Sequence, residues 1–164
     1  TLYWGGNAHV SQHPIAPKRR VYYHHNFYDD IGTSTVYVPW TTGLEGFTPL
    51  GSAAQLFISD ATLLKVFFTV DDVSGDATVT MGLTYRAPAS DSNVAVATKT
   101  FDIDTNSDRD VIMVDWSGTA AIPAGSLVGI YLDSSADVGG NEWYNLTSVW
   151  EIDMSTELTG SITS

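Results

Sequence analysis

The residues whose spacing best suits a chemical role are oxygen-bearing side chains at alternate positions. Asp102, Asp104, Asn106 and Asp108 follow one another at every second residue, and such side chains converge on a calcium ion when a loop curls. The glycine and the closing glutamate that complete an EF-hand loop are absent from this segment. It is therefore a candidate calcium site, and the alternative is that the aspartates face water at the end of a strand.

A second candidate chemistry is sugar binding by aromatic rings. Trp143 and Tyr144 lie between Asn141-Glu142 and Asn145. A flat ring complements the C–H face of a pyranose, while amides and carboxylates bind its hydroxyls. The pair is a candidate glycan contact, and the alternative is that the tryptophans anchor the core or a subunit interface.

Motifs for catalysis are absent. The chain contains neither a Gly-x-Ser-x-Gly elbow nor a phosphate-binding glycine loop, and it has no cysteine. Most aspartates stand in turn contexts, where capping of backbone groups explains them. His24 and His25 are adjacent in an extended segment, so their side chains point to opposite sides and cannot chelate one ion together. We expect a protein that is not an enzyme and binds no cofactor other than calcium.

Residues 1–30 are predicted to be an extended docking arm. The segment is rich in aromatic residues, and Pro14 and Pro17 prevent a continuous helix. Such rings need a surface to cover them, either of this domain, of a neighbouring copy or of a larger particle. The residues expected to dock are basic or aromatic: Tyr3, Trp4, Lys18, Arg19, Arg20, Tyr22, Tyr23 and Phe27.

Charge and composition exclude two classes of partner. The net charge is −12. Residues 1–28 hold three basic residues and no acidic one, and the rest of the chain holds 19 acidic and four basic residues, so the two parts carry +3 and −15. Nucleic-acid binding needs clustered cations, which this chain lacks. No apolar run approaches the roughly 20 residues of a membrane-spanning helix.

The elements that would position these residues are short strands separated by turns. Ala77–Tyr85 alternates between apolar and polar residues, which is the pattern of a half-buried strand. Further strands are expected at Thr35–Val38, Thr62–Val70, Val94–Ile103, Val111–Val114, Leu127–Leu132 and Tyr144–Ile152. Seven strands without intervening helices predict an all-β, antiparallel β-sandwich, specifically a jelly roll, over residues 31–154. Residues 155–164 are predicted to be a flexible C-terminal tail.

Two segments resemble known structural proteins. His25-Asn-Phe-Tyr-Asp-Asp-Ile-Gly-Thr33, with Val36-Tyr-Val-Pro-Trp40, is similar to a segment of virion structural proteins of bacteriophages, especially cyanophages. Ile122-Pro-Ala-Gly-Ser-Leu-Val-Gly-Ile-Tyr-Leu132, with Tyr144–Asp153, resembles the last strands of trimeric jelly-roll heads of the tumour-necrosis-factor type. The resemblance implies a homotrimer without enzymatic activity.

The sequence therefore predicts a phage virion structural protein located at the particle surface. Its role would be a trimeric capsid decoration or a tail-fibre, receptor-binding domain, with other virion proteins and host surface polysaccharide as partners. A carbohydrate-binding module of a secreted enzyme is the alternative, with Trp143 and Tyr144 as its platform. A small hydrolase is the third hypothesis, and a triad assembled from distant residues would be its requirement.

Overall fold

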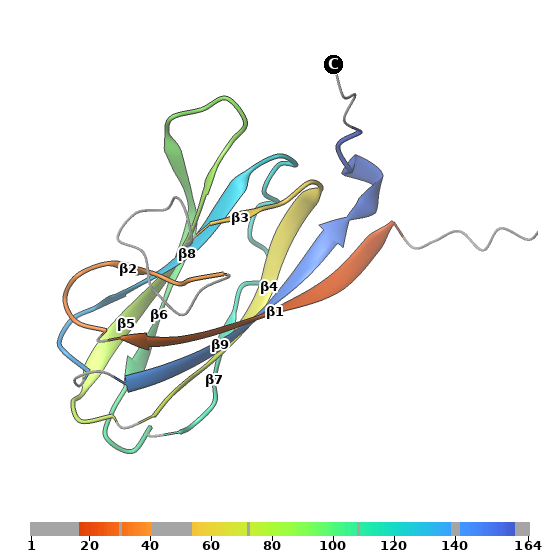
Figure 1. Cartoon of the computed structure of the whole chain (residues 1–164). Coiled ribbons are helices and arrows are strands. Elements are labelled where there is room, and N and C mark those ends of the chain that lie inside the picture. The colour runs from red at the N-terminus through yellow and green to blue at the C-terminus, as the bar shows by residue number, and fades with distance from the viewer. Residues whose placement is uncertain are drawn as a thin grey trace, which may run out of the picture.

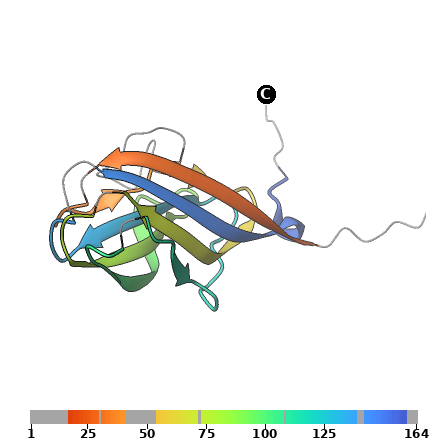
Figure 2. The ribbon, with the colours of Figure 1, turned by 90° about the horizontal axis from the view of Figure 1, so that it is seen from below.

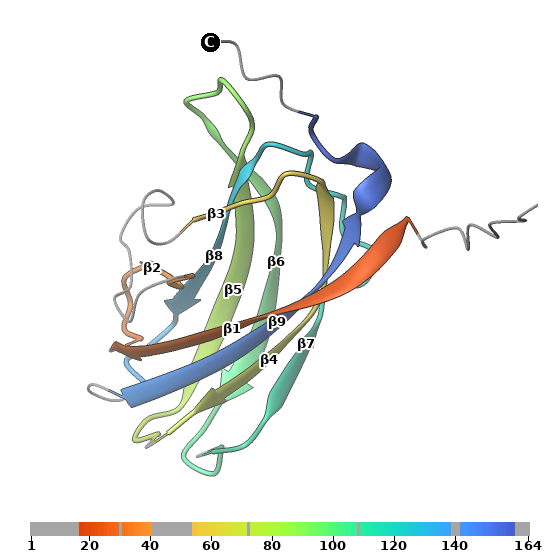
Figure 3. The ribbon, with the colours of Figure 1, turned by 45° about the vertical axis from the view of Figure 1, so that its right-hand side comes forward.

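The computed structural model describes residues 17–29, 31–40, 54–71, 73–107, 109–138 and 142–159. In these ranges two antiparallel sheets face each other across one core (Figure 1, Figure 3). The first sheet has the order β1 (Lys18–Asp29), β9 (Glu142–Asp153), β4 (Asp60–Val70) and β7 (Ile112–Asp115). The second has the order β2 (Val36–Tyr37), β8 (Leu127–Ser134), β5 (Ala77–Arg86) and β6 (Asn93–Ile103), with β3 (Gln55–Leu56) also paired to β8.

The strand order is that of a jelly roll. Strands β2 and β3 pair with two different parts of β8, at Tyr131–Leu132 and at Leu127–Val128, so together they fill one strand position. Counted in this way, the first sheet contains positions 1, 8, 3 and 6, and the second contains positions 2, 7, 4 and 5. The chain therefore crosses between the sheets at each described connection except the β5–β6 hairpin. This confirms the predicted fold class.

Alternation along the strands builds the core. In β5 the inward side chains Ala77, Val79, Met81 and Leu83 are buried, whereas Thr78 between them is exposed. The largest side chains that are fully buried come from strands of the β1-β9-β4-β7 sheet and from the connection after β7: Phe27, Phe68, Tyr144, Trp150 and Trp116. Full burial of a phenylalanine such as Phe27 or Phe68 stabilises the fold by about 1.5–3 kcal/mol relative to exposure.

Strand β1 corrects the predicted docking arm. Lys18–Asp29 pairs with β9 over its whole length, from Lys18↔Asp153 to Asp29↔Glu142, and Figure 2 shows the orange β1 and the blue β9 side by side. Phe27, expected to dock on another surface, is fully buried and stacks on Tyr144. This part of the predicted arm is thus an edge strand of the sandwich itself, and residues 1–16 lie outside the described ranges.

The segment after β9 also differs from expectation. Met154–Thr156 forms a short 3₁₀ helix, η2, capped by the Asp153 carboxylate, which accepts from the Ser155 N–H at 3.0 Å. The Leu158 N–H donates to the Ile58 carbonyl at 2.8 Å, so the start of the predicted tail packs on the sandwich. Residues 160–164 are outside the description. None of the helices in the described ranges has the length and apolarity needed to cross a membrane.

Candidate functional site

The outer face of the β1-β9-β4-β7 sheet carries large apolar side chains. One row across the strands consists of His24, Thr147, Phe67 and Met113, which are register partners in that order. Met113 is 52% exposed and Phe67 36% exposed, and Tyr22 in the adjacent row is 57% exposed. A soluble sheet with one face in water usually places polar residues there. The row is therefore a candidate binding face.

A hollow of about 300 Å³ lies in this face, lined by Arg20, Tyr22, Leu64, Lys65, Phe67 and Val149. A β-bulge creates part of it. Leu63 pairs with Trp150 and Lys65 pairs with Val149, so Leu64 is an extra residue in β4. Such a bulge re-aims side chains, and here it brings both Leu64 and Lys65 to the hollow.

Of the described basic side chains at or near the hollow, one is in an ion pair and two are not. The Lys18 ammonium and the Glu151 carboxylate lie 2.7 Å apart, and this bond together with the Glu151 charge raises the pKa of Lys18 above its ordinary value. Among the described residues, Arg20 and Lys65 are in no ion pair. The hollow thus combines an apolar, aromatic floor with two cations that a negatively charged partner group could neutralise.

The other residues predicted to dock have different environments. Tyr23 faces inward and packs edge-on against Trp40 and Phe57, with ring centroids 5.2 and 5.8 Å away. Arg19 is exposed. Tyr3 and Trp4 lie outside the described residues. The structure therefore groups Arg20 and Tyr22 at the hollow and separates them from Tyr23.

A polar network lies within the core beneath this face. The His25 Nδ1–H donates to the Pro39 carbonyl at 2.9 Å, because a carbonyl can only accept. The His25 Nε2 atom lies 3.1 Å from the Ser148 Oγ atom, which accepts from the Trp150 indole N–H at 2.9 Å. Burial lowers the pKa of His25 below its ordinary value of 6.5.

The Ser148–His25 pair has the residue types of a nucleophile and its base. Ser148 is fully buried and His25 is 3% exposed, so no substrate can reach the hydroxyl in this structure. His24, by contrast, is exposed and bonds the Thr147 hydroxyl at 2.9 Å. The prediction that the two histidines point to opposite sides is confirmed, and the buried pair has a structural role in joining β1 to β9.

The predicted calcium segment forms a capped turn at the end of β6. The Asp104 Oδ1 atom accepts from the Asn106 N–H at 2.8 Å and from the Ser107 hydroxyl at 3.1 Å. Asp102 accepts from the Thr78 hydroxyl instead, at 2.7 Å. The described residues contain no group of three acidic, histidine or cysteine side chains placed for a metal ion, and Asp108 is outside them. The residues described here do not fit a calcium site, and calcium binding stays a prediction.

The predicted glycan contact is corrected at one of its two residues. Tyr144 is fully buried, stacked between Phe27 and Phe68 at centroid distances of 5.3 and 5.9 Å. Its ring therefore has no surface to offer a sugar. Trp143 belongs to β9, and its side chain lies outside the described part of the chain.

Sequence reasoning missed Leu64, Lys65, Phe67 and Met113 as members of the exposed face. A signal was present, because Phe67 and Phe68 are consecutive in a strand and only one of two neighbours can face the core. Phe68 is fully buried and Phe67 is the outward one. Two adjacent large aromatic residues in a predicted strand are thus a marker of an apolar outer face.

Comparison with known proteins gives distant likenesses only. Neither a protein-family model nor a curated protein matches the chain. Among solved structures, that of the Eiger TNF from S. frugiperda is similar over 87% of this chain and 98% of that one, at 10% identity and a TM-score of 0.39. The desmodium yellow mottle tymovirus structure is similar over 92% of this chain and 95% of that one, at 13% identity and a TM-score of 0.31.

A third likeness is to the virus-like particle of the extra small virus of the giant freshwater prawn Macrobrachium rosenbergii. It extends over 86% of this chain and 84% of that one, at 11% identity and a TM-score of 0.24. Identities and scores this low carry no functional argument, and the fold assignment rests on the strand order.

Proposed function

We propose that this chain is a non-enzymatic structural protein of a bacteriophage virion, which assembles into a homotrimer through the outer face of the β1-β9-β4-β7 sheet. The observation that carries the proposal is the exposed apolar pair Phe67 and Met113 in one row of this face, with Tyr22 and the hollow beside it. Tyr22, Phe67 and Met113 are exposed on β1, β4 and β7 of a face that a solitary soluble domain would keep polar.

Charge supports a second copy as the occupant. Four of the seven basic residues of the chain stand on β1 and β4: Lys18, Arg19, Arg20 and Lys65. The chain as a whole carries −12, so carboxylates outnumber cations on the surface that a neighbouring copy presents. Arg20 and Lys65 would pair with carboxylates of the neighbour, and the apolar floor between them would pack on its side chains.

The virion assignment comes from the sequence. The segments at residues 25–40 and 122–153 resemble phage structural proteins and trimeric jelly-roll heads, and a sandwich without cysteine gains ruggedness by assembly. Within the virion, both a capsid decoration and a fibre tip are consistent with this geometry. A decoration binds empty capsids and raises their melting temperature, whereas a fibre tip binds isolated host cells.

The test is the native mass of the full chain, measured with and without Phe67→Asp. We expect the unaltered chain to be a trimer and Phe67→Asp to be a monomer, because a carboxylate at the centre of the interface would be desolvated without a partner. Val94→Asp is the matched control, since Val94 is 42% exposed on β6 of the other sheet. It should remain a trimer.

Two results would overturn the proposal. If the unaltered chain is a monomer at micromolar concentration, the proposed trimer is wrong. If Phe67→Asp is still a trimer, this face is not the trimer interface. Docking to the particle is tested separately by deleting residues 1–16, which spares β1. Normal incorporation of that deletion would remove the docking role of Tyr3 and Trp4.

A further inference from the structure

The outer face of the second sheet carries an aromatic pair that the assembly proposal does not use. Tyr37 of β2 and Tyr131 of β8 are register partners, with ring centroids 5.7 Å apart and planes tilted by 55°. On its other side Tyr131 pairs with Gly82 of β5. Both rings are half-buried, so each retains a solvent-facing part.

Gly82 leaves room for the Tyr131 ring on the outer side of the sheet. A Cβ atom at position 82 would lie 1.9 Å from the ring carbon Cζ and 2.4 Å from the hydroxyl oxygen of Tyr131. The ring therefore occupies the space that any other side chain at this position would fill. The end of the Tyr131 side chain therefore lies over Gly82 on the outer side of the sheet.

Polar groups surround this pair without bonds of their own. Thr98 is the register partner of Gly82, and Thr80 pairs with both Thr100 and Asp133. None of the four side chains makes a hydrogen bond within the described part of the chain. Burial and the neighbouring Tyr131 raise the pKa of Tyr37 above its ordinary value of 10.0, so its hydroxyl is protonated and can donate at neutral pH.

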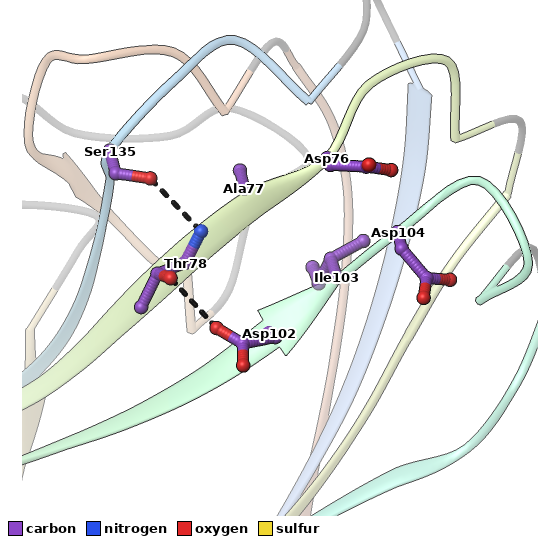
Figure 4. A pocket seen from close by; sticks show the side chains of 7 residues that line it. All are labelled: Asp76, Ala77, Thr78, Asp102, Ile103, Asp104 and Ser135. Carbon is purple, nitrogen blue, oxygen red and sulfur yellow. Dashed lines mark hydrogen bonds between the residues drawn. The ribbon is translucent and has the colours of Figure 1, made fainter.

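Farther along the same face lies a polar hollow of about 290 Å³ (Figure 4). The Thr78 hydroxyl donates to Asp102 Oδ1 at 2.7 Å, and the Thr78 N–H donates to the Ser135 hydroxyl at 3.0 Å. Asp76 and Asp104 accept backbone N–H groups through Oδ1 as well. The Oδ2 atoms of these three aspartates make no hydrogen bond among the described residues and can accept from a ligand.

The two features form one strip. Thr78 and Gly82 are four residues apart on the same side of β5, which separates them by about 14 Å at about 3.4 Å per residue. An aromatic pair therefore stands at one end as a platform, hydroxyls line the middle, and free carboxylate oxygens stand at the other end. An oligosaccharide offers the matching groups, because its C–H faces stack on aromatic rings and its hydroxyls donate to carboxylates.

We propose that this strip, from the Tyr37–Tyr131 pair to the Asp76–Asp102–Asp104 hollow, binds a neutral oligosaccharide. The charge of the site selects against acidic sugars, because the carboxylates of Asp76, Asp102, Asp104 and Asp133 would repel a uronic or sulfated unit. The platform distinguishes the strip from an ordinary acidic surface. The proposal does not depend on trimer formation, since it uses the opposite sheet.

The test is binding of the full chain to an array of neutral and acidic glycans, followed by titration of the best neutral hit by NMR. We expect neutral glycans to bind and acidic ones not to bind. The shifted amide signals should belong to β5, β6 and β8 and not to β1 or β9. This mapping needs no substitution, so it holds even where a variant fails to fold.

Substitutions then test whether the Tyr37 and Tyr131 rings contact the glycan. Tyr131→Ala and Tyr37→Ala should each weaken binding by at least about tenfold, whereas Tyr131→Phe keeps the stacking ring and should bind nearly as the unaltered chain does. Tyr28→Ala is the control, an aromatic residue 46% exposed on β1 of the other sheet. The native mass of the Tyr37 and Tyr131 variants should equal that of the unaltered chain, which separates this site from the assembly face.

Three outcomes would reject the site: absence of binding to any neutral glycan, binding to acidic glycans only, or unchanged affinity in both tyrosine variants. A signal shift confined to β1 and β9 would reject it as well, because it would place the ligand on the assembly face.

Discussion

The Nε2 atom of His25 lies 3.1 Å from the Oγ atom of Ser148 and joins strand β1 to strand β9 inside the core. The neutral imidazole fits this position without an unsatisfied group. Nδ1–H donates to the Pro39 carbonyl, and Nε2 accepts from the serine hydroxyl, which itself accepts from Trp150. A protonated ring would turn Nε2 into a donor and leave the serine hydrogen without its acceptor.

We therefore expect the fold to lose stability in mild acid through His25. Above its ordinary pKa of 6.5 the ring is neutral in both the folded and the unfolded chain, so its contribution is fully present. Burial lowers the folded pKa, so between 6.5 and that lower value the unfolded chain binds a proton that the folded chain does not. Stability thus falls as the pH falls through this window.

The measurement is the free energy of unfolding between about pH 7.5 and about pH 5 for the unaltered chain, His25→Gln and His24→Gln. This range extends about one pH unit above and about 1.5 units below the ordinary pKa of 6.5. His25→Gln should be less stable at pH 7.5 by about 1–3 kcal/mol because it leaves buried partners unsatisfied. It should also lose less on acidification than the unaltered chain. His24 and Tyr23 are the titratable side chains beside the ring on β1, and His24→Gln, at an exposed position, should keep the pH dependence. A His25→Gln curve parallel to that of the unaltered chain would contradict the assignment.

The role of β1 gives a second prediction. Phe27→Ala should destabilise the fold by about 3–5 kcal/mol, since it removes a fully buried ring stacked on Tyr144. Tyr22→Ala on the same strand removes a ring that is 57% exposed, and its cost to the isolated subunit should be within about 0.5 kcal/mol. Urea unfolding at low protein concentration measures both. Equal and small effects would mean that residues 18–29 are not an integral strand.

A third prediction concerns the turn after β6. Asp104→Ala removes the carboxylate that accepts from the Asn106 N–H and the Ser107 hydroxyl. Hydrogen–deuterium exchange at Asn106 should become faster in this variant, because that amide loses its acceptor. Asp102→Ala is the control, since its carboxylate bonds the Thr78 hydroxyl on β5 and no amide of the turn. Equal exchange at Asn106 in both variants would remove the capping role.

Sequence alone predicted the seven strands whose own alternation marks an inner and an outer side. Ala77–Tyr85 is the clearest example, because its apolar residues Ala77, Val79, Met81 and Leu83 are buried as expected, although Gly82 and Thr84 on the other side are buried too. The sequence did not predict the strand Lys18–Asp29, because consecutive aromatic residues there hide the alternation between apolar and polar positions. The segment has aromatic residues on both sides of the strand, so residue type does not show which side faces the core. Only pairing with β9 decides which of Tyr22, Tyr23, Phe27 and Tyr28 face inward.

The candidate sites were harder to predict because they depend on register between distant strands. Phe67, Met113 and His24 form a row only when β4, β7, β9 and β1 are aligned. Irregularities add to this. The register shift between Leu83 and Thr84 makes Val96 the extra residue of β6, so a strict two-residue period cannot assign the faces of that strand. Tyr144 was misassigned because a Trp-Tyr pair in a strand does not reveal which ring is buried.

The relationship between Gly82 and Tyr131 gives a final prediction. Gly82→Val should destabilise the fold by about 1–3 kcal/mol, because the new side chain needs the volume that the Tyr131 ring occupies and the ring must turn away. Tyr131→Ala vacates that volume, so the double variant Gly82→Val with Tyr131→Ala should be more stable than the sum of the two single effects predicts. The coupling is measured as a double-mutant cycle from urea unfolding of the four proteins.

Gly118→Val is the control for glycine replacement itself, since nothing lies within 4 Å of a Cβ atom at that position. The φ of 83° at Gly118 adds backbone strain to this variant. Tyr131→Ala should not restore its stability. Additive effects at Gly82 and Tyr131 would show that the ring does not lie over the glycine, and the aromatic platform on the second sheet would lose its geometric basis.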